Sequence, residues 1–323
     1  MKHISILALN DSILGSVVGP HKVFTEINNI LVSMGSNPIF DVKIVGLDKK
    51  VNLDNDLFTI NTHLLLDEVK KTDLIIIPAM YGDLKNAIEL NKKFIPWIIE
   101  KYKNGTEVAS FCVGAFLLAS TGLLDGKTCS THWVAENEFK KMFPKVKLVT
   151  NKIITDENGI YSSGGAFSFL NLLIYLVEKY AGKEIAILAS KIFQIEIERM
   201  DQSPFMIFNG QKEHEDNTIK QIQDFIEKNY NEKFSVDDLA SKYALSRRSL
   251  ERRFKKATSN SIIEYIQRVK IESAKMILES SKDNVNEIMY KTGYSDIKSF
   301  RNIFKKITGL SPLQYRNKYT RIS

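Results

Sequence analysis

Two patterns of hydrophobic and polar residues divide the chain near residue 200. Before that point, short β-rich apolar runs alternate with stretches whose apolar residues recur at helical spacing, which predicts a parallel sheet covered by helices. The predicted strands are 3–9, 40–47, 74–78, 107–111, 147–149 and 160–162. The predicted helices are 19–33, 81–90, 92–104, 114–120, 135–143, 167–181 and 183–200. We therefore expect residues 1–200 to form an open α/β layer of about five to seven strands.

The pattern changes after a polar, turn-rich stretch at 201–216, which contains Ser-Pro and Asn-Gly steps and predicts a linker. Beyond it the strand signals disappear, and apolar residues recur at intervals of three and four. We expect 217–323 to form a second domain that is entirely helical. Two domains also suit a chain of 323 residues, because single hydrophobic cores usually stop growing below this length.

The helical region contains an internal repeat. Residues 235–246 match 284–295 at an offset of 49, and 249–258 match 299–308 at an offset of 50. Each copy predicts a short helix, a turn and a second helix. This is the order of a helix-turn-helix motif, so the domain is expected to carry two of them in tandem.

The turn of each copy has residues that suit a sharp reversal. Ala244 in the first copy and Gly293 in the second are small enough to permit it. The serine that follows, Ser246 or Ser295, is expected to cap the free N–H groups of the second helix.

The outward face of each second helix is mostly basic, and we predict that it contacts the bases and phosphates of double-stranded DNA. The predicted DNA-contacting residues are Arg247, Arg248, Glu251, Arg252, Lys255, Lys256, Lys298, Arg301, Asn302, Lys305 and Lys306, with Arg253 expected on the same face. Glu251 could accept a hydrogen bond from cytosine or equally form a salt bridge. Residues 262–279 predict a connecting helix of about 27 Å, close to the roughly 34 Å between successive major-groove faces. The connecting helix could therefore hold both recognition helices in adjacent grooves of asymmetric DNA. The alternative is a basic helical bundle used for protein contacts.

The charge distribution favours the DNA-binding interpretation. The whole chain carries a net charge of +7. Residues 217–323 contain 22 Lys/Arg against 12 Asp/Glu, a net charge of +10, whereas residues 1–216 contain 23 against 26, a net charge of −3. A positive charge concentrated in one third of the chain suits a polyanionic partner.

Residues 217–323 resemble the AraC/XylS family DNA-binding domain over its whole length, most specifically in the run from Gly293 to Arg316. The resemblance places base-reading roles on Arg248, Glu251, Arg252, Lys298, Arg301 and Asn302.

The first region contains a candidate nucleophile. Cys112 lies where the strand 107–111 runs into a helix, and Gly114 permits tight passage. We expect an elbow that exposes the thiol above the sheet, with a helix N-terminus that lowers the thiol pKa. His132 follows twenty residues later and could serve as the base. The alternative is that Cys112 is simply a small buried residue and His132 a loop histidine. No cofactor or metal is expected, because the Cys/His pair has no companion ligands.

Residues 1–200 resemble the PfpI and class I glutamine amidotransferase-like superfamily in the run from Cys112 to Trp133, which contains Cys-x-Gly-Ala-Phe, Gly-Leu-Leu-Asp-Gly and Thr-His-Trp. This resemblance implies a flavodoxin-like open parallel sheet sandwich. The whole chain resembles the GlxA-type transcriptional regulators. That resemblance implies a regulator that binds double-stranded DNA, responds to a small-molecule effector, forms a homodimer and contacts RNA polymerase.

The enzymatic pattern is incomplete. Ser16 stands where the deglycase-like branch carries a glutamate. Amidotransferases carry a glutamate two residues after the histidine, but here Trp133 and Val134 follow His132. The Pro-Gly-Gly turn is replaced by Pro78-Ala79-Met80. A nucleophile that lacks its acid should be a poor catalyst, so we predict no enzymatic activity.

We instead predict an effector-sensing pocket at the carboxyl ends of the strands, with redox sensing by the cysteine as a variant. The predicted pocket residues are Asn10, Asp11, Met80, Tyr81, Cys112 and His132. The rival hypothesis is a cysteine-dependent amidase or deglycase with a DNA-binding tail.

The sequence also carries expectations about location. The first ten residues resemble a strand and lack both the apolar core and the cleavage site of a signal peptide. The longest apolar stretch, 167–177, is interrupted by polar residues and is shorter than the roughly 18 residues that span a membrane. Two cysteines cannot build a disulfide framework. We therefore expect a cytoplasmic protein without a membrane partner.

Overall fold

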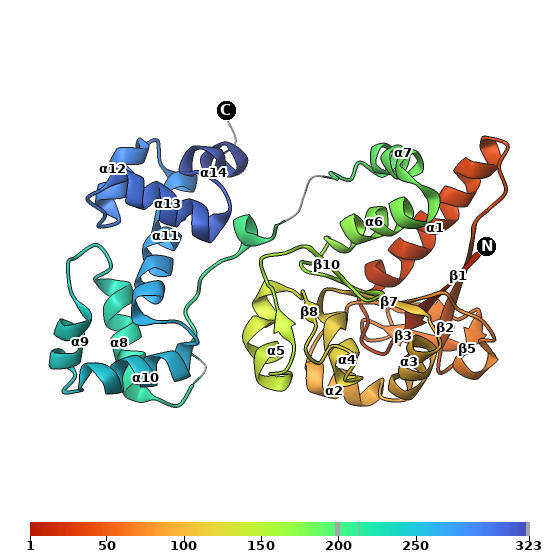
Figure 1. Ribbon diagram of the computed structural model, residues 1–323, viewed down its shortest axis with the longest axis horizontal. Helices are drawn as coiled ribbons and strands as arrows, with labels where there is room; N and C mark the ends of the chain where they lie inside the picture. Colours follow the sequence, from red (N-terminus) through yellow and green to blue (C-terminus); the bar gives the residue numbers. More distant parts are fainter. Residues whose placement is uncertain (198–200, 213, 321–323) are drawn as a thin grey trace. The chain divides into compact units, whose positions relative to one another are not determined.

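The computed structural model describes residues 1–197, 201–212 and 214–320 (Figure 1). The chain forms two compact units, Met1–Gln202 and Ser203–Ser323. None of the described helices is both long enough and apolar enough to cross a membrane.

The first unit is built on a seven-stranded sheet of order β10-β11-β7-β6-β1-β2-β5. All neighbouring strands are parallel except β10 and β11, which form an antiparallel edge. The strand bounds are β1 (Lys2–Ala8), β2 (Phe40–Gly46), β5 (Leu64–Leu65), β6 (Leu74–Ile77), β7 (Glu107–Phe111), β10 (Ile154–Glu157) and β11 (Ile160–Ser163). The predicted open parallel sheet is thereby confirmed.

Helices cover both faces of this sheet, as Figure 1 shows. On one face lie α1 (Leu14–Ser33), α6 (Phe169–Ala181) and α7 (Lys183–Phe193). On the other lie α2 (Leu84–Leu90), α3 (Phe94–Lys103), α4 (Ala115–Ser120) and α5 (Glu136–Met142). The apolar run of β6 explains the two cores, because Leu74 and Ile76 pack on the first set while Ile75 and Ile77 pack on the second. Such continuous hydrophobicity is typical of a parallel strand buried on both faces.

The described residues also form two smaller sheets and four 3₁₀ turns, of which η4 belongs to the second unit. The hairpin pairs β3 (Lys50–Leu53) with β4 (Phe58–Asn61), and β8 (Thr128–Cys129) pairs in parallel with β9 (Lys147–Leu148). The 3₁₀ turns are η1 (Leu66–Glu68), η2 (Cys112–Gly114), η3 (Trp133–Ala135) and η4 (Ser203–Phe205).

The structure differs from the prediction at several elements of the first unit. The strand predicted at 147–149 pairs only with β8 and does not join the main sheet. The helix predicted over 183–200 ends at Phe193, because Gln194 adopts a left-handed conformation with φ of 54°. Residues 198–200 of that prediction lie outside the described residues. The β3–β4 hairpin was not predicted.

The second unit is helical throughout its described residues. The helices are α8 (Asn217–Lys228), α9 (Val236–Lys242), α10 (Arg247–Thr258), α11 (Ile262–Ser280), α12 (Val285–Lys291), α13 (Ile297–Thr308) and α14 (Pro312–Tyr319). The long helix α11, about 28 Å at 1.5 Å per residue, contributes to both cores of the unit. Tyr265 and Val269 pack in the first core, and Ile271 and Leu278 pack in the second. One helix therefore supports both copies of the repeat.

We predicted a linker at 201–216, but its described residues belong to one unit or the other. Gln202 is buried in the first unit, where its side-chain amide donates to three backbone carbonyls. From Ser203 onward the described residues belong to the second unit. There the ring of Phe208 lies 5.1 Å from that of Tyr265, and Lys275 Nζ donates to the carbonyl of Met206.

Candidate DNA interface and effector site

The two helix-turn-helix motifs are α9–α10 and α12–α13. Ala244 in the first turn and Gly293 in the second both adopt positive φ, 52° and 74°. A Cβ at Gly293 would lie 2.6 Å from the backbone oxygen of Asn231, so a larger residue would displace the loop that precedes α9. The backbone therefore requires glycine at position 293, whereas Ala244 adopts the left-handed conformation in spite of its Cβ.

The caps of the two recognition helices differ. Ser246 caps α10 by accepting a hydrogen bond from the N–H of Ser249 at 3.2 Å, as predicted. In the second copy the prediction of Ser295 is wrong, because Asp296 caps α13 and accepts from the N–H of Ser299 at 2.7 Å. The reason is the extra residue that changes the offset of the repeat from 49 to 50.

Each recognition helix packs its apolar face inward and leaves a basic face exposed. Leu250 and Phe254 of α10, and Phe300 and Phe304 of α13, are fully buried. Since these pairs are four residues apart, the opposite face of each helix is free to meet a ligand. The predicted DNA-contacting residues that are exposed and have no hydrogen bond or ion pair within the described chain are Arg248, Arg252, Lys255, Lys256, Lys298, Arg301, Asn302, Lys305 and Lys306.

Three charged residues of α10 have partners inside the unit. Arg247 pairs with Asp237 at 2.9 Å and with Glu251 at 3.0 Å, so Glu251 forms the salt bridge that the sequence left as one alternative. Arg253 is half-buried and donates from Nε and Nη2 to the carboxylate of Asp216, at 2.8 and 2.6 Å. Arg253 thus has a partner inside the unit, and its place on the outward face beside Arg252 stays a prediction.

Cys112 occupies the elbow after β7, but its side chain is not exposed. Its φ of 54° is left-handed, as expected of a strained strand-to-helix turn. The residue is only 4% exposed, and burial raises the pKa of its thiol to about 11, although a hydrogen bond from the Val113 N–H lowers it slightly. Both expectations for this thiol, exposure and a lowered pKa, are thus wrong. Apolar surroundings outweigh the single turn η2 that follows.

His132 lies in the loop between β8 and η3. Its Nδ1 accepts a hydrogen bond from the N–H of Val134 at 3.1 Å, and burial lowers the pKa of the imidazole, which favours the neutral form. Within the described residues no hydrogen bond joins the Cys112 thiol to this ring. The two loops are linked instead by Thr131, whose hydroxyl donates to the Cys112 carbonyl at 2.9 Å.

The turn after β6 and the start of α1 are bonded to each other. The buried Ser16 hydroxyl donates to the Ile13 carbonyl at 2.7 Å and accepts from the Ala79 N–H at 3.1 Å. At the position where the deglycase-like branch carries a glutamate, this chain therefore has a serine whose hydroxyl joins α1 to the turn after β6. Because the Ala79 N–H already has an acceptor, it is not free to stabilise an oxyanion.

The structure brings four of the predicted pocket residues together at the carboxyl ends of the adjacent strands β1 and β6. Tyr81 donates its N–H to the Asp11 carbonyl at 2.9 Å, and Met80 forms a bridge with Ser12. Asn91, which the sequence did not indicate, is buried and accepts from the N–H of Asn10 at 2.9 Å.

Several buried polar atoms among the described residues of the first unit have no hydrogen-bond partner. In the part of the chain that the structure describes, they include the hydroxyls of Ser12, Ser163 and Ser168 and the side-chain carbonyl of Gln202. Ser163 lies opposite Phe111, the residue before Cys112, across the β7–β11 pair. Such atoms could accept or donate to a ligand. No group of three or more His, Cys, Asp or Glu that could hold a metal was found over 1–197, 201–212 and 214–320.

Two family models match separate parts of the chain. The model of the DJ-1/PfpI family matches residues 16–179, which is about half of the sequence and includes Ser16, Cys112 and His132. This chain belongs to the DJ-1/PfpI family. A helix-turn-helix domain model matches residues 239–318, which cover both recognition helices and agree with the AraC-type resemblance. The chain thus joins a DJ-1/PfpI domain to an AraC-type DNA-binding domain.

Two similar proteins are named as transcriptional regulators. The HTH-type transcriptional regulator GbdR of Pseudomonas aeruginosa is 25% identical over 254 residues, which cover 77% of this chain and 67% of that protein. The HTH-type transcriptional regulator CdhR of the same species is 22% identical over 274 residues, which cover 84% of this chain and 80% of that protein. The crystal structure of a THiJ/PfpI family protein from Pseudomonas syringae aligns with a TM-score of 0.51 at 15% identity, over 60% of this chain and 75% of that one. It shows the DJ-1/PfpI fold.

Proposed function

We propose that this chain is a sequence-specific transcriptional regulator whose second unit binds double-stranded DNA and whose DJ-1/PfpI unit senses a small-molecule effector. The observation that carries the proposal is the pair of exposed, basic recognition helices, α10 and α13, supported by the single helix α11. Their exposed side chains provide both point charges for phosphates and planar groups for base edges. A homodimer and a contact with RNA polymerase belong to the proposal because the resemblance implies them.

We further propose that the DJ-1/PfpI unit is not an enzyme. Three features support this part of the proposal: the buried Cys112 thiol with a pKa of about 11, the neutral His132 without a bond to that thiol, and Ser16 in place of an acid. A buried, protonated thiol is a weak nucleophile. The partnerless polar atoms near β11 instead suit a bound ligand.

The DNA-binding part is tested by selecting duplexes from random DNA with the purified full-length protein and measuring Kd for the best sequence. Arg252→Ala and Lys298→Ala should each weaken binding about 5- to 150-fold if each side chain contacts a base edge in bidentate fashion, which corresponds to about 1–3 kcal/mol. Wild-type affinity in both variants would refute these assignments. Failure to select any sequence would refute the function itself.

The non-enzymatic part is tested by incubating the wild-type protein and Cys112→Ala with glutamine, other amides and glycated thiols. We expect no turnover above the uncatalysed rate in either protein. Turnover that disappears in Cys112→Ala would establish a cysteine-dependent enzyme and overturn this part of the proposal, while leaving the DNA-binding part intact.

A further inference from the structure

The segment before α8 lies along the DNA-binding unit and contacts it at several points. We refer to residues 203–212 and 214–216 as the strap. At its start, the carbonyl of Met206 accepts from Lys275 Nζ at 2.6 Å, and the N–H of Phe208 donates to Glu272 at 3.1 Å. Both partners belong to α11, so the strap is attached to the helix that supports both motifs.

The middle of the strap approaches the first core closely. Gly210 has a φ of 67°, and a Cβ there would lie 2.6 Å from the Tyr265 hydroxyl and 2.9 Å from Glu227 Oε1. Gln211 accepts two hydrogen bonds, one at its carbonyl from Gln223 Nε2 at 3.0 Å and one at its side-chain oxygen from Asn260 Nδ2 at 3.2 Å. A larger residue at position 210 would be strained by this φ and would have to displace the Tyr265 hydroxyl and the Glu227 carboxylate.

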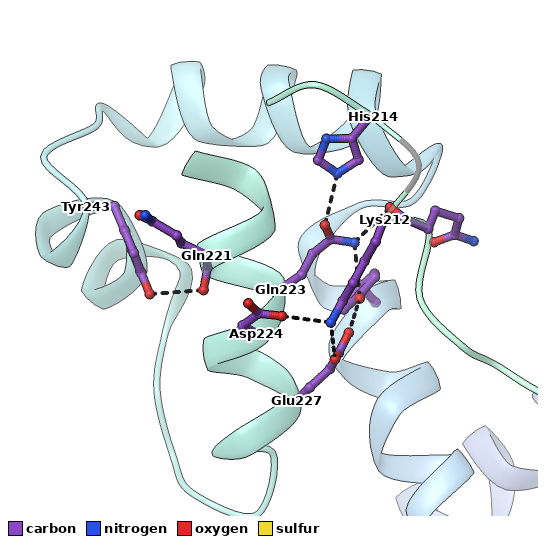
Figure 2. Close-up of polar contacts among 9 residues, drawn as sticks. Lys212, His214, Gln221, Gln223, Asp224, Glu227 and Tyr243 are labelled. Atoms are coloured by element: carbon purple, nitrogen blue, oxygen red, sulfur yellow. Dashed lines mark hydrogen bonds and ion pairs between the residues drawn. The ribbon is translucent and has the colours of Figure 1, made fainter. Parts of the chain in front are cut away.

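Figure 2 shows how the next residues meet α8. Lys212 Nζ lies 2.7 Å from both Asp224 and Glu227, and a ring nitrogen of His214 lies 2.9 Å from Gln223 Oε1. The Lys212 and Asp224 side chains are 40% and 54% exposed, so each ion pair contributes little. The two ion pairs of Lys212 therefore add little to the stability of the docked strap.

The end of the strap reaches the first recognition helix. Asp216 caps α8 through the N–H of Ile219 and also binds Arg253 of α10 with both carboxylate oxygens. The guanidinium of Arg253 holds the pKa of this carboxyl below its usual value, so the pair stays charged at neutral pH. His214, Glu215 and Asp216 also line a groove of about 480 Å³ together with Arg252 and Lys256 on the predicted DNA face.

We propose that the strap positions recognition helix α10 for DNA, with Asp216 acting through Arg253 and with Gly210 and Lys212 keeping the strap docked. The inference rests on the proposed DNA binding and deepens it. If the docked strap favours the DNA-bound geometry of α10, only molecules with a docked strap bind DNA at full strength. A variant with a smaller docked fraction should therefore bind DNA with a lower apparent affinity. By linkage, bound DNA must stabilise docking by the same factor.

The test compares three strap variants with one control in the full-length protein, using the best duplex selected from random DNA. Gly210→Ala introduces the clashing Cβ, Lys212→Met removes both ion pairs, and Asp216→Asn breaks the charge pair while asparagine still caps α8. The control, Lys282→Met, removes an exposed lysine that has no ion pair in the described chain. We expect about tenfold weaker binding in the strap variants, loss of footprint on the α10 side only, and wild-type binding in the control.

Hydrogen exchange separates positioning from mere folding. In the wild-type protein, bound DNA should slow exchange at the Phe208 and Asp216 amides by the factor that the variants lose in affinity. Wild-type affinity in all three strap variants, or strap exchange that DNA leaves unchanged, would overturn the inference. Loss of exchange protection throughout α8 and α10 in all three variants would also overturn it, because the strap would then be needed for folding alone. A wild-type protein that binds no duplex would refute the proposed function, and the inference with it.

Discussion

The salt dependence of DNA binding follows from the number of free cations on the two recognition helices. Eight exposed Lys or Arg side chains on α10 and α13 have no internal ion pair in the described chain: Arg248, Arg252, Lys255, Lys256, Lys298, Arg301, Lys305 and Lys306. Each phosphate that such a side chain neutralises contributes about −0.9 to the slope of log K against log salt. These eight side chains should therefore contribute a slope of up to about −7 for each bound chain, or roughly a 10⁴-fold loss of affinity between 50 and 200 mM salt.

One lysine variant and one arginine variant test whether the unpaired cations are the ones that contact phosphates. Lys305→Gln removes a free cation and should make the slope less negative by about 0.9 if Lys305 meets a phosphate. Arg247→Gln removes a cation whose charge Asp237 and Glu251 already balance, so the slope should change by much less. Fluorescence anisotropy with a labelled selected duplex, titrated from 50 to 300 mM KCl, measures both. Equal changes in the two variants, or none in either, would refute the reasoning that internal pairing selects the DNA-contacting residues.

Two further predictions concern the helix cap and the thiol. Asp296→Ala should lower the free energy of unfolding by about 1 kcal/mol through loss of the α13 cap, whereas Ser295→Ala should leave it nearly unchanged in urea denaturation. Equal losses would contradict the assigned cap. Cys112 should react with iodoacetamide at pH 7 at least about 100-fold more slowly in the native protein than in urea, since burial raises its pKa to about 11 and keeps it protonated. A native rate that rises to a plateau below pH 8 would show a thiolate and contradict the buried site.

The sequence predicts those parts of the molecule whose signal is local. The apolar run of β6 and the repeat of the helix-turn-helix motifs are visible as patterns, and the structure has both where they were expected. The β3–β4 hairpin was missed because its strands have four residues each, although the Asp-Asn-Asp turn at 54–56, with three positive φ angles, is a recognisable signal.

The candidate sites depend on contacts that no local pattern contains. The burial of Cys112, which is 4% exposed, reverses the pKa shift expected from an elbow. Arg253 looks like its neighbour Arg252 in sequence, but its partner Asp216 lies 37 residues earlier. Gln202 reaches the Thr131 carbonyl across 71 positions. Single polar residues of this kind carry no motif, so only the folded chain shows their partners.

The central claim is that each recognition helix contacts its own segment of one duplex. Hydroxyl-radical footprinting of the selected duplex tests it most directly, with the wild-type protein, the α10 variant Arg248→Ala/Arg252→Ala and the α13 variant Lys298→Ala/Arg301→Ala. We predict two protected segments about 10 base pairs apart, with one lost in each variant and the other retained. A single protected segment, or loss of the same segment in both variants, would contradict the account.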